Sequence, residues 1–256
     1  MSQTILSFLS EHLSDKKAIG ALNKNWLSYG ALRELKKDVH KALRKNGIAK
    51  QDRVAIVLPN GPTMATAFVT IAQCTTTAPL NPNYREDEFS FYLDDLKAKA
   101  LVVNDGYDGP AAAAAERLDI KIIRLIESDQ VAGLFSLVGD GDKDFIEDEE
   151  VCENDVALIL HTSGTTSRPK IVPLLQSNIA ASASNIAQSL SLSSADRCLN
   201  VMPLFHIHGL IAAVSASLSV GASIWCSSGF NALSFFSNLD EAKPTWSVSY
   251  THLRAH

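Results

Sequence analysis

Between Arg53 and Ile126 the chain alternates between short apolar runs and longer segments with helical periodicity. The apolar runs have the length and the β-branched content of buried strands, and they cover 53–58, 76–80, 99–103 and 121–126. The segments between them predict helices over 63–73, 86–96 and 111–118. Strands and helices that alternate at this spacing form βαβ units with a parallel sheet. We therefore predict an α/β fold of mainly parallel sheets flanked by helices.

A long amphipathic helix is predicted ahead of this alternation, from Ser28 to Asn46. Ser28 suits the N-cap position, and Gly47 suits the residue that follows the last turn. The apolar residues of this segment fall on one stripe of the helix, and they are Leu32, Leu35, Val39, Ala42 and Leu43. The lysine-rich opposite side is interpreted as a solvated face.

Residues 140–155 are acidic and poor in apolar side chains, so they predict an exposed linker. This linker divides the chain into a first α/β subdomain at 1–150 and a second one at 151–246. The second subdomain is predicted to contain strands at 156–160 and 198–202, a strand-like run at 172–175 and a helix capped by Ser177.

The stretch from Cys198 to Leu239 contains no Asp, Glu, Lys or Arg, so we compared it with a membrane-spanning helix. A spanning helix needs about 20 predominantly apolar residues. Within this stretch several serines interrupt the apolar run, and basic flanks are missing. We predict a buried helix over 207–220 that ends at Gly221, followed by a buried strand over 222–226, and no transmembrane segment.

The composition sets limits on partners and compartment. The net charge of −5 argues against nucleic acid as a partner. The four cysteines lie far apart and form no CxxC pair, which favours free thiols in a reducing compartment. The N-terminus lacks the basic region and the apolar length of a signal peptide. A cytoplasmic or peroxisomal protein that is not secreted is expected.

The string HTSGTTSRPKIVPL, from His161 to Leu174, carries the candidate chemistry. It follows the apolar run VALIL, so a buried strand is predicted to lead into a loop rich in hydroxyl groups. Hydroxyls and backbone N–H groups donate hydrogen bonds to phosphate oxygens, and a lysine offsets their charge. The string is not a P-loop, since that motif needs G-K-(S/T) running into a helix. We predict phosphate binding by Thr162, Ser163, Gly164, Thr165, Thr166, Ser167 and Lys170.

This string resembles the phosphate-binding signature of the AMP-forming adenylating superfamily, TSG(S/T)TGxPKG, which includes the acyl-CoA synthetases. It departs from that signature at Ser167 and Ile171, where the family has glycine. Its TTSRPK form is similar to the branch of oxalate–CoA ligase-like synthetases. Two further segments fit the resemblance, and they are 78–103 and MPLFHIHGL at 202–210. The resemblance implies the N-terminal part of the large domain of an adenylate-forming enzyme.

The resemblance also implies a reaction and its participants. A small carboxylic acid, such as oxalate, reacts with ATP to give acyl-AMP and pyrophosphate, and the acyl group then passes to coenzyme A. Mg²⁺ arrives with ATP, because it prefers phosphate oxygens and water. Lys170 and His206 are the catalytic candidates, with His206 lining the acyl pocket. His206 and His208 are predicted on one face of a strand, and no third ligand is visible, so no metal site is predicted.

Other signatures of this superfamily, including the Y-G-x-T-E segment, the ribose-binding aspartate and the C-terminal lid domain with its adenylation lysine, are not found in the sequence. The family pattern holds through Trp246, whereas 247–256 depart from it. We therefore expect a truncated ligase with a non-native tail at 247–256 that does not complete catalysis by itself. The alternative is a non-catalytic fragment that binds a nucleotide or an acyl group.

Overall fold

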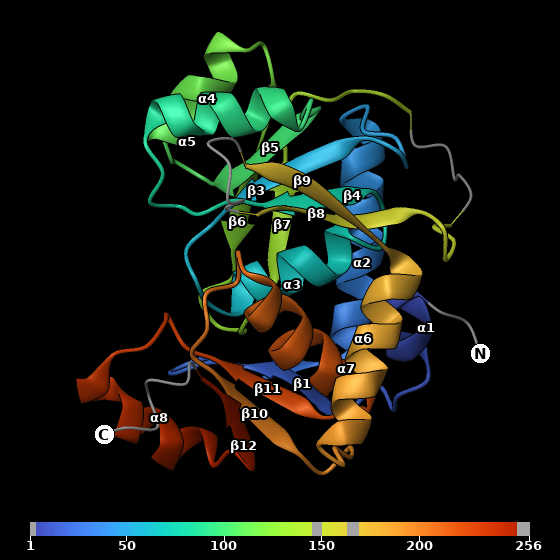
Figure 1. The fold of residues 1–256 in the computed structure, drawn as a ribbon, viewed down its shortest axis with the longest axis vertical. Helices are drawn as coiled ribbons and strands as arrows, with labels where there is room; N and C mark the ends of the chain where they lie inside the picture. Colours follow the sequence, from blue (N-terminus) through green and yellow to red (C-terminus); the bar gives the residue numbers. More distant parts are fainter. Residues whose placement is uncertain (1–3, 145–149, 163–168, 250–256) are drawn as a thin grey trace.

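The computed structural model describes residues 4–144, 150–162 and 169–249, and these fold around two sheets (Figure 1). Among these residues the larger sheet has the strand order β7-β6-β5-β3-β4-β8-β9. Its central strands are parallel, and β7 and β9 are antiparallel edges. The strands are β3 (Arg53–Val57), β4 (Thr76–Pro79), β5 (Ala100–Asn104), β6 (Lys121–Glu127), β7 (Phe135–Val138), β8 (Val156–Thr162) and β9 (Lys170–Leu175).

The smaller sheet has the order β12-β10-β11-β1-β2 in the described part of the chain. Its strands run parallel except for β2, which is antiparallel to β1. They are β1 (Lys17–Gly20), β2 (Leu27–Ser28), β10 (Arg197–Asn200), β11 (Ser223–Cys226) and β12 (Trp246–Val248). The prediction of mainly parallel sheets is confirmed. The linker at 140–155 does not separate the two sheets, because β1 and β2 join β10–β12, while β8 and β9 join β3–β7.

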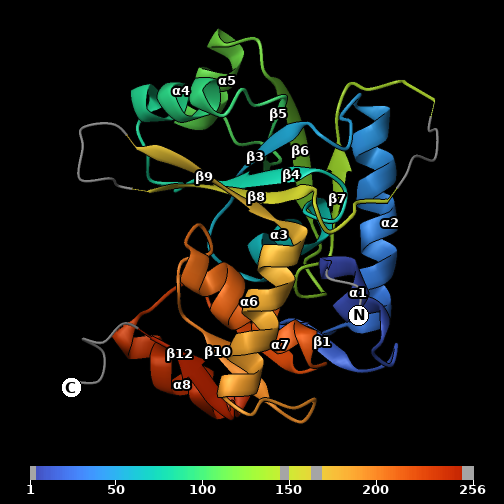
Figure 2. The ribbon, with the colours of Figure 1, turned by 45° about the vertical axis from the view of Figure 1, so that its right-hand side comes forward.

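Helices form three layers around the sheets (Figures 1 and 2). The helix α3 lies between the sheets and contacts β4 of the larger one and β1 and β11 of the smaller one. The helices α4 and α5 cover the outer face of the larger sheet, and α8 covers the outer face of the smaller one. The helices are α1 (Ile5–Ser10), α2 (Tyr29–Lys45), α3 (Pro62–Ile71), α4 (Glu86–Asp95), α5 (Pro110–Arg117), α6 (Gln176–Ser189), the π-helix η1 (His208–Ser215), α7 (Ala216–Ser219) and α8 (Ala232–Ala242).

The central strands are apolar on both faces because both faces are covered by helices. On β3, Val54 and Ile56 join the core between the sheets, whereas Ala55 and Val57 join the core under α4 and α5. The side chains alternate because successive residues of a strand point to opposite faces. This explains why these strands read as continuous apolar runs in the sequence.

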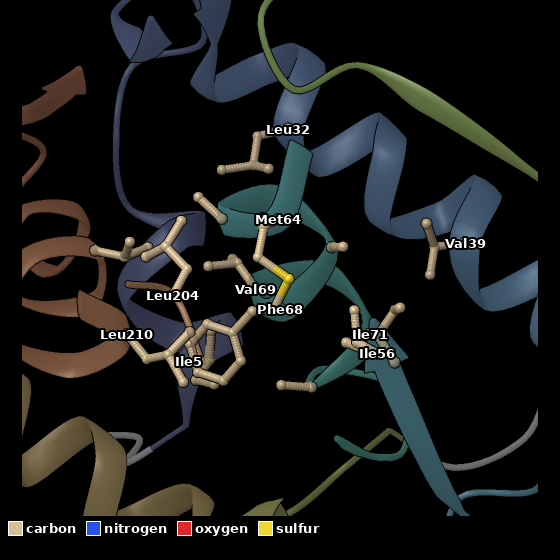
Figure 3. Packing of buried hydrophobic residues seen from close by; sticks show 14 of the residues in the cluster. Ile5, Leu32, Val39, Ile56, Met64, Phe68, Val69, Ile71, Leu204 and Leu210 are labelled. Atoms are coloured by element: carbon tan, nitrogen blue, oxygen red, sulfur yellow. The ribbon is translucent and has the colours of Figure 1, made fainter. Parts of the chain in front are cut away.

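The central helix α3 is buried on every side. All residues from Thr63 to Ile71 are buried, so this helix has no solvated stripe. Phe68 is fully buried and shares one apolar cluster with Ile5, Leu204 and Leu210 (Figure 3). The cluster therefore connects the N-terminal helix, the central helix and the segment around η1.

Several local predictions needed correction. Ser177 does not cap α6, because Leu175 holds the N-cap position and the N–H groups of Gln176 and Ser177 bond to the carbonyls of Asp155 and Glu153. The helix predicted over 207–220 is present, but its first part is the π-helix η1; its second part, α7, ends at Ser219, and Gly221 follows with a φ of 73°. The linker is not fully exposed, since Val151 and Asp155 are buried.

Within the described residues no helix is both long and apolar enough to cross a membrane.

Asp155 is a buried carboxylate at the start of β8. It accepts hydrogen bonds from the Cys152 N–H at 2.7 Å and from Gln51 Nε2 at 2.7 Å, and Lys50 Nζ lies 3.1 Å away. Burial by itself would raise the pKa of Asp155, but these hydrogen bonds and the ammonium group outweigh it and lower the pKa to about 2. This carboxylate therefore connects the loop after α2 to the residue directly before the β8–β9 hairpin.

Replacing Asp155 with Asn should lower the free energy of unfolding at pH 7 by about 2 kcal/mol. In the native protein this contribution is present above the ordinary pKa of 3.8 and is lost as the pH falls towards about 2. Urea unfolding at pH 7 and pH 3 measures the difference, and the variant should show the smaller change between the two values. The exposed Asp142→Asn variant serves as the control. Equal pH dependence in Asp155→Asn and the native protein would contradict the assignment.

Phe68→Ala should remove a fully buried ring from the layer between the sheets and leave a cavity. The expected loss in the free energy of unfolding is about 3–5 kcal/mol. Phe91→Ala is the matched control, because Phe91 is 37% exposed on α4. Denaturant titration followed by tryptophan fluorescence measures both variants, and similar losses for the two would argue against the central role of α3.

Candidate functional site

The predicted phosphate loop connects β8 to β9 at the edge of the larger sheet. Thr162 is the last residue of β8 and Lys170 the first residue of β9, and the two are register partners. Both side chains are exposed, and neither has a hydrogen bond or ion pair to another described residue. A hydroxyl and a cation therefore face solvent across the stem of one hairpin. Residues 163–168 lie outside the described residues, so the roles of Ser163, Gly164, Thr165, Thr166 and Ser167 stay predictions.

A histidine next to this stem fixes the end of β8. His161 Nε2 lies 3.0 Å from Oδ2 of Asp95, the last residue of α4. The His161 side chain is only 7% exposed, and its ring meets Tyr92 edge-on at 4.7 Å. Tyr92 in turn stacks on Tyr84 at 4.8 Å. The sequence interpretation assigned no role to this cluster, although a histidine at the end of an apolar strand was a visible signal.

His206 lies in the turn between β10 and η1, and the prediction that it shares a strand face with His208 is wrong. The strand β10 ends at Asn200, His206 follows in a bend, and His208 is the first residue of η1. After β10 the chain enters the core between the sheets, where Leu204 is buried. Phe205 packs against the His206 ring with a centroid distance of 4.4 Å.

The surroundings of His206 favour a neutral imidazole. Burial of the ring by its surroundings, and secondarily the nearby His208, lower the pKa of His206 below its ordinary value of 6.5. At neutral pH this ring therefore offers one N–H donor without a full positive charge. In both views the orange segment between β10 and α7 lies below the strands β8 and β9 (Figures 1 and 2).

The described residues fit an anionic ligand better than a resident metal. Lys170 and Thr162 supply a cation and a hydroxyl, which suit phosphate oxygens. Among the residues that the structure describes, no group of three His, Cys, Asp or Glu could hold a metal ion.

Cys198 and Cys226 are buried free thiols, and burial raises the pKa of each, to about 12 for Cys226.

Comparison with known proteins assigns the family. Residues 10–254 match the family described as AMP-binding enzyme, and the chain belongs to that family. The oxalate–CoA ligase of Arabidopsis thaliana is 34% identical over 94% of this chain and 48% of its own length. The oxalate–CoA ligase of Saccharomyces cerevisiae is 35% identical over 78% of this chain and 41% of its own length. The chain thus spans about half the length of the curated relatives it matches.

Solved structures support the same fold. The o-succinylbenzoate–coenzyme A synthetase of Bacillus subtilis in complex with AMP aligns over all of this chain and 50% of its own, with a TM-score of 0.79 and 20% identity. A long-chain-fatty-acid–CoA ligase of Archaeoglobus fulgidus covers 95% of this chain and 51% of its own, with a TM-score of 0.78 and 25% identity. The fold is therefore that of the N-terminal part of adenylate-forming enzymes.

Replacing His208 with Gln should raise the pKa of His206, because it removes a neighbouring group that disfavours the imidazolium. The pKa should stay below 6.5, since burial is the larger cause of the shift. An NMR titration of the histidine side chains measures this value. His12→Gln, a change in a histidine that contacts α7, should leave the pKa of His206 unchanged. An unchanged pKa of His206 in the His208→Gln variant would contradict this account.

Proposed function

We propose that the protein is an ATP-dependent acid–CoA ligase and that this chain carries its phosphate-binding half. The observation that carries the proposal is the pair Thr162 and Lys170, exposed opposite each other at the stem of the β8–β9 hairpin. A triphosphate and a carboxylate are both anions, so the reaction needs a cation and hydrogen-bond donors that bring them together. Lys170 supplies that cation, and Thr162 with Ser163, Gly164, Thr165, Thr166 and Ser167 would donate hydrogen bonds to phosphate oxygens.

In the proposed first step, a carboxylate oxygen of the acid attacks the α-phosphorus of ATP. The bond from that phosphorus to the oxygen bridging to the β-phosphate breaks, and pyrophosphate leaves. Lys170 would stabilise the charge on the departing group. In the second step the thiol of coenzyme A attacks the acyl carbon, AMP leaves, and the thiol proton is released. Mg²⁺ would come with ATP and neutralise phosphate charge.

His206 would orient the carboxylate. A neutral imidazole can donate its N–H to a carboxylate oxygen, and it does not form the tight ion pair that would hold the acid in its ground state. The lowered pKa of His206 is consistent with this role at neutral pH. Its place in the exposed turn before η1 leaves the ring accessible to a small acid.

The substrate is proposed to be oxalate or another small carboxylic acid. Support comes from the two oxalate–CoA ligases at 34% and 35% identity. The 4-coumarate–CoA ligase 2 of Nicotiana tabacum is 28% identical to this chain. An aromatic acid such as 4-coumarate is therefore the alternative substrate to compare with oxalate. A cytoplasmic or peroxisomal location is proposed with this activity. The competing proposal is a non-catalytic fragment that binds a nucleotide or an acyl group, and it draws on the half-length match to the relatives.

The test is pyrophosphate release by the full-length gene product, with ATP, Mg²⁺ and a panel of acids that includes oxalate, malonate and 4-coumarate. Lys170→Ala should lower kcat/KM for ATP by about 10- to 100-fold, because a charge-assisted hydrogen bond is lost. Lys97→Ala, at an exposed lysine on the turn after α4, is the matched control and should have no effect.

Release that depends on one acid and is weakened by Lys170→Ala would support the ligase and identify its substrate. ATP binding without release for any acid would favour the non-catalytic alternative. Equal activity of Lys170→Ala and Lys97→Ala would refute the proposed role of Lys170, whatever the substrate.

A further inference from the structure

Asn60 connects three chain segments beside the proposed site. It lies in the loop between β3 and α3, and its Oδ1 accepts a hydrogen bond from the Leu204 N–H at 2.8 Å. Its Nδ2 donates to the Ser227 carbonyl at 3.1 Å. Leu204 follows β10 and Ser227 follows β11. One side chain of the larger sheet's loop therefore holds the chain at the carboxyl ends of two strands of the smaller sheet.

Both partners define how the amide is oriented. The Leu204 N–H can only donate, so it requires the oxygen of Asn60, and the Ser227 carbonyl can only accept, so it requires the nitrogen. An aspartate would keep the first bond and lose the second. An alanine would lose both, leaving the backbone N–H of a residue that is only 1% exposed without its acceptor.

The turn held by Asn60 carries His206. A second asparagine closes the same turn from within, because Asn200 donates to the Met202 carbonyl and accepts from the Met202 N–H, each at 3.1 Å. The turn is also tight at its far side, where a Cβ on Gly209 would come within 2.6 Å of the Pro203 carbonyl oxygen. His206 itself is exposed, and its backbone N–H donates a hydrogen bond to the Pro203 carbonyl at 3.3 Å. The placement of the His206 ring therefore follows the placement of Leu204.

We infer that Asn60 is a positioning residue that acts through His206 by fixing the turn from Met202 to His206 against the larger sheet. The inference rests on the proposed function, in which His206 orients the carboxylate of the acid. Asn60 does not need to touch the substrate. Its effect should therefore fall on the use of the acid rather than on the affinity for ATP.

The first experiment compares Asn60→Ala and Asn60→Asp with Asn46→Ala in the pyrophosphate assay. Asn46 is a matched control, because its side chain also joins two backbone groups away from His206. It accepts a hydrogen bond from the Gly141 N–H and donates one to the Ala42 carbonyl. Asn60→Ala should lower kcat/KM for the acid by at least about tenfold, with KM for ATP changed by less than about twofold. Asn60→Asp should fall between Asn60→Ala and the native protein. Asn46→Ala should change the stability only.

A double-mutant cycle with His206→Ala separates positioning from general stabilisation. If Asn60 acts through His206, Asn60→Ala should have almost no further effect on kcat/KM in the His206→Ala background. Additive effects of the two substitutions would overturn the inference. Equal losses for the acid and for ATP in the single Asn60→Ala variant would overturn it as well.

A second readout does not depend on the proposed activity. The side-chain NMR signals of His206 should shift in Asn60→Ala, partly recover in Asn60→Asp, and remain unchanged in Asn46→Ala. If no acid supports pyrophosphate release, the proposed function fails, and a shifted His206 signal would still establish that Asn60 holds the turn. An unshifted His206 signal in Asn60→Ala would refute the positioning role even in an active enzyme.

Discussion

The burial of α3 on all sides is the constraint on which the rest of the structure depends. A helix without a solvated face must be enclosed, and here it is enclosed by one sheet on each side. The same layer contains η1 and α6, and Phe68 packs with residues from α1 and η1. The two sheets therefore share one core, and the loops at their strand ends are held in a fixed relation to each other.

This shared core holds together chain segments that are distant in sequence and that carry the proposed site residues. The β8–β9 hairpin belongs to the larger sheet, while the turn with His206 follows a strand of the smaller sheet. Asn60 joins the two units directly through the Leu204 N–H and the Ser227 carbonyl. On this scaffold Lys170 stays exposed and unpaired with any described residue, which suits a group that must meet a highly charged ligand. Partial desolvation of the exposed His206 ring and the nearby His208 lower the pKa of His206, which suits its proposed role as a hydrogen-bond donor.

Much of the larger sheet could be predicted from the sequence, because its strands are covered on both faces and so appear as apolar runs. The smaller sheet was only partly predictable. Its strands β1 and β2 are four and two residues long, and they are specified by pairing with β11 and with each other rather than by their own composition. The cap of α6 was missed for a related reason, since the carbonyls of Glu153 and Asp155, which lie before β8, accept hydrogen bonds from its first two N–H groups.

The α/β class and the order of most strands and helices could be predicted from the sequence alone, because apolar periodicity is a local property. The phosphate-binding role of the string from His161 to Leu174 also comes from a local pattern, and it stays a prediction. The tertiary structure was needed to show which strands share a sheet, that His206 lies in a turn after β10, and that Asp95 and Asn60 bond to His161 and Leu204. These features depend on hydrogen bonds and packing between segments up to 167 residues apart. No local pattern encodes such contacts, since they arise only when the chain has closed around α3.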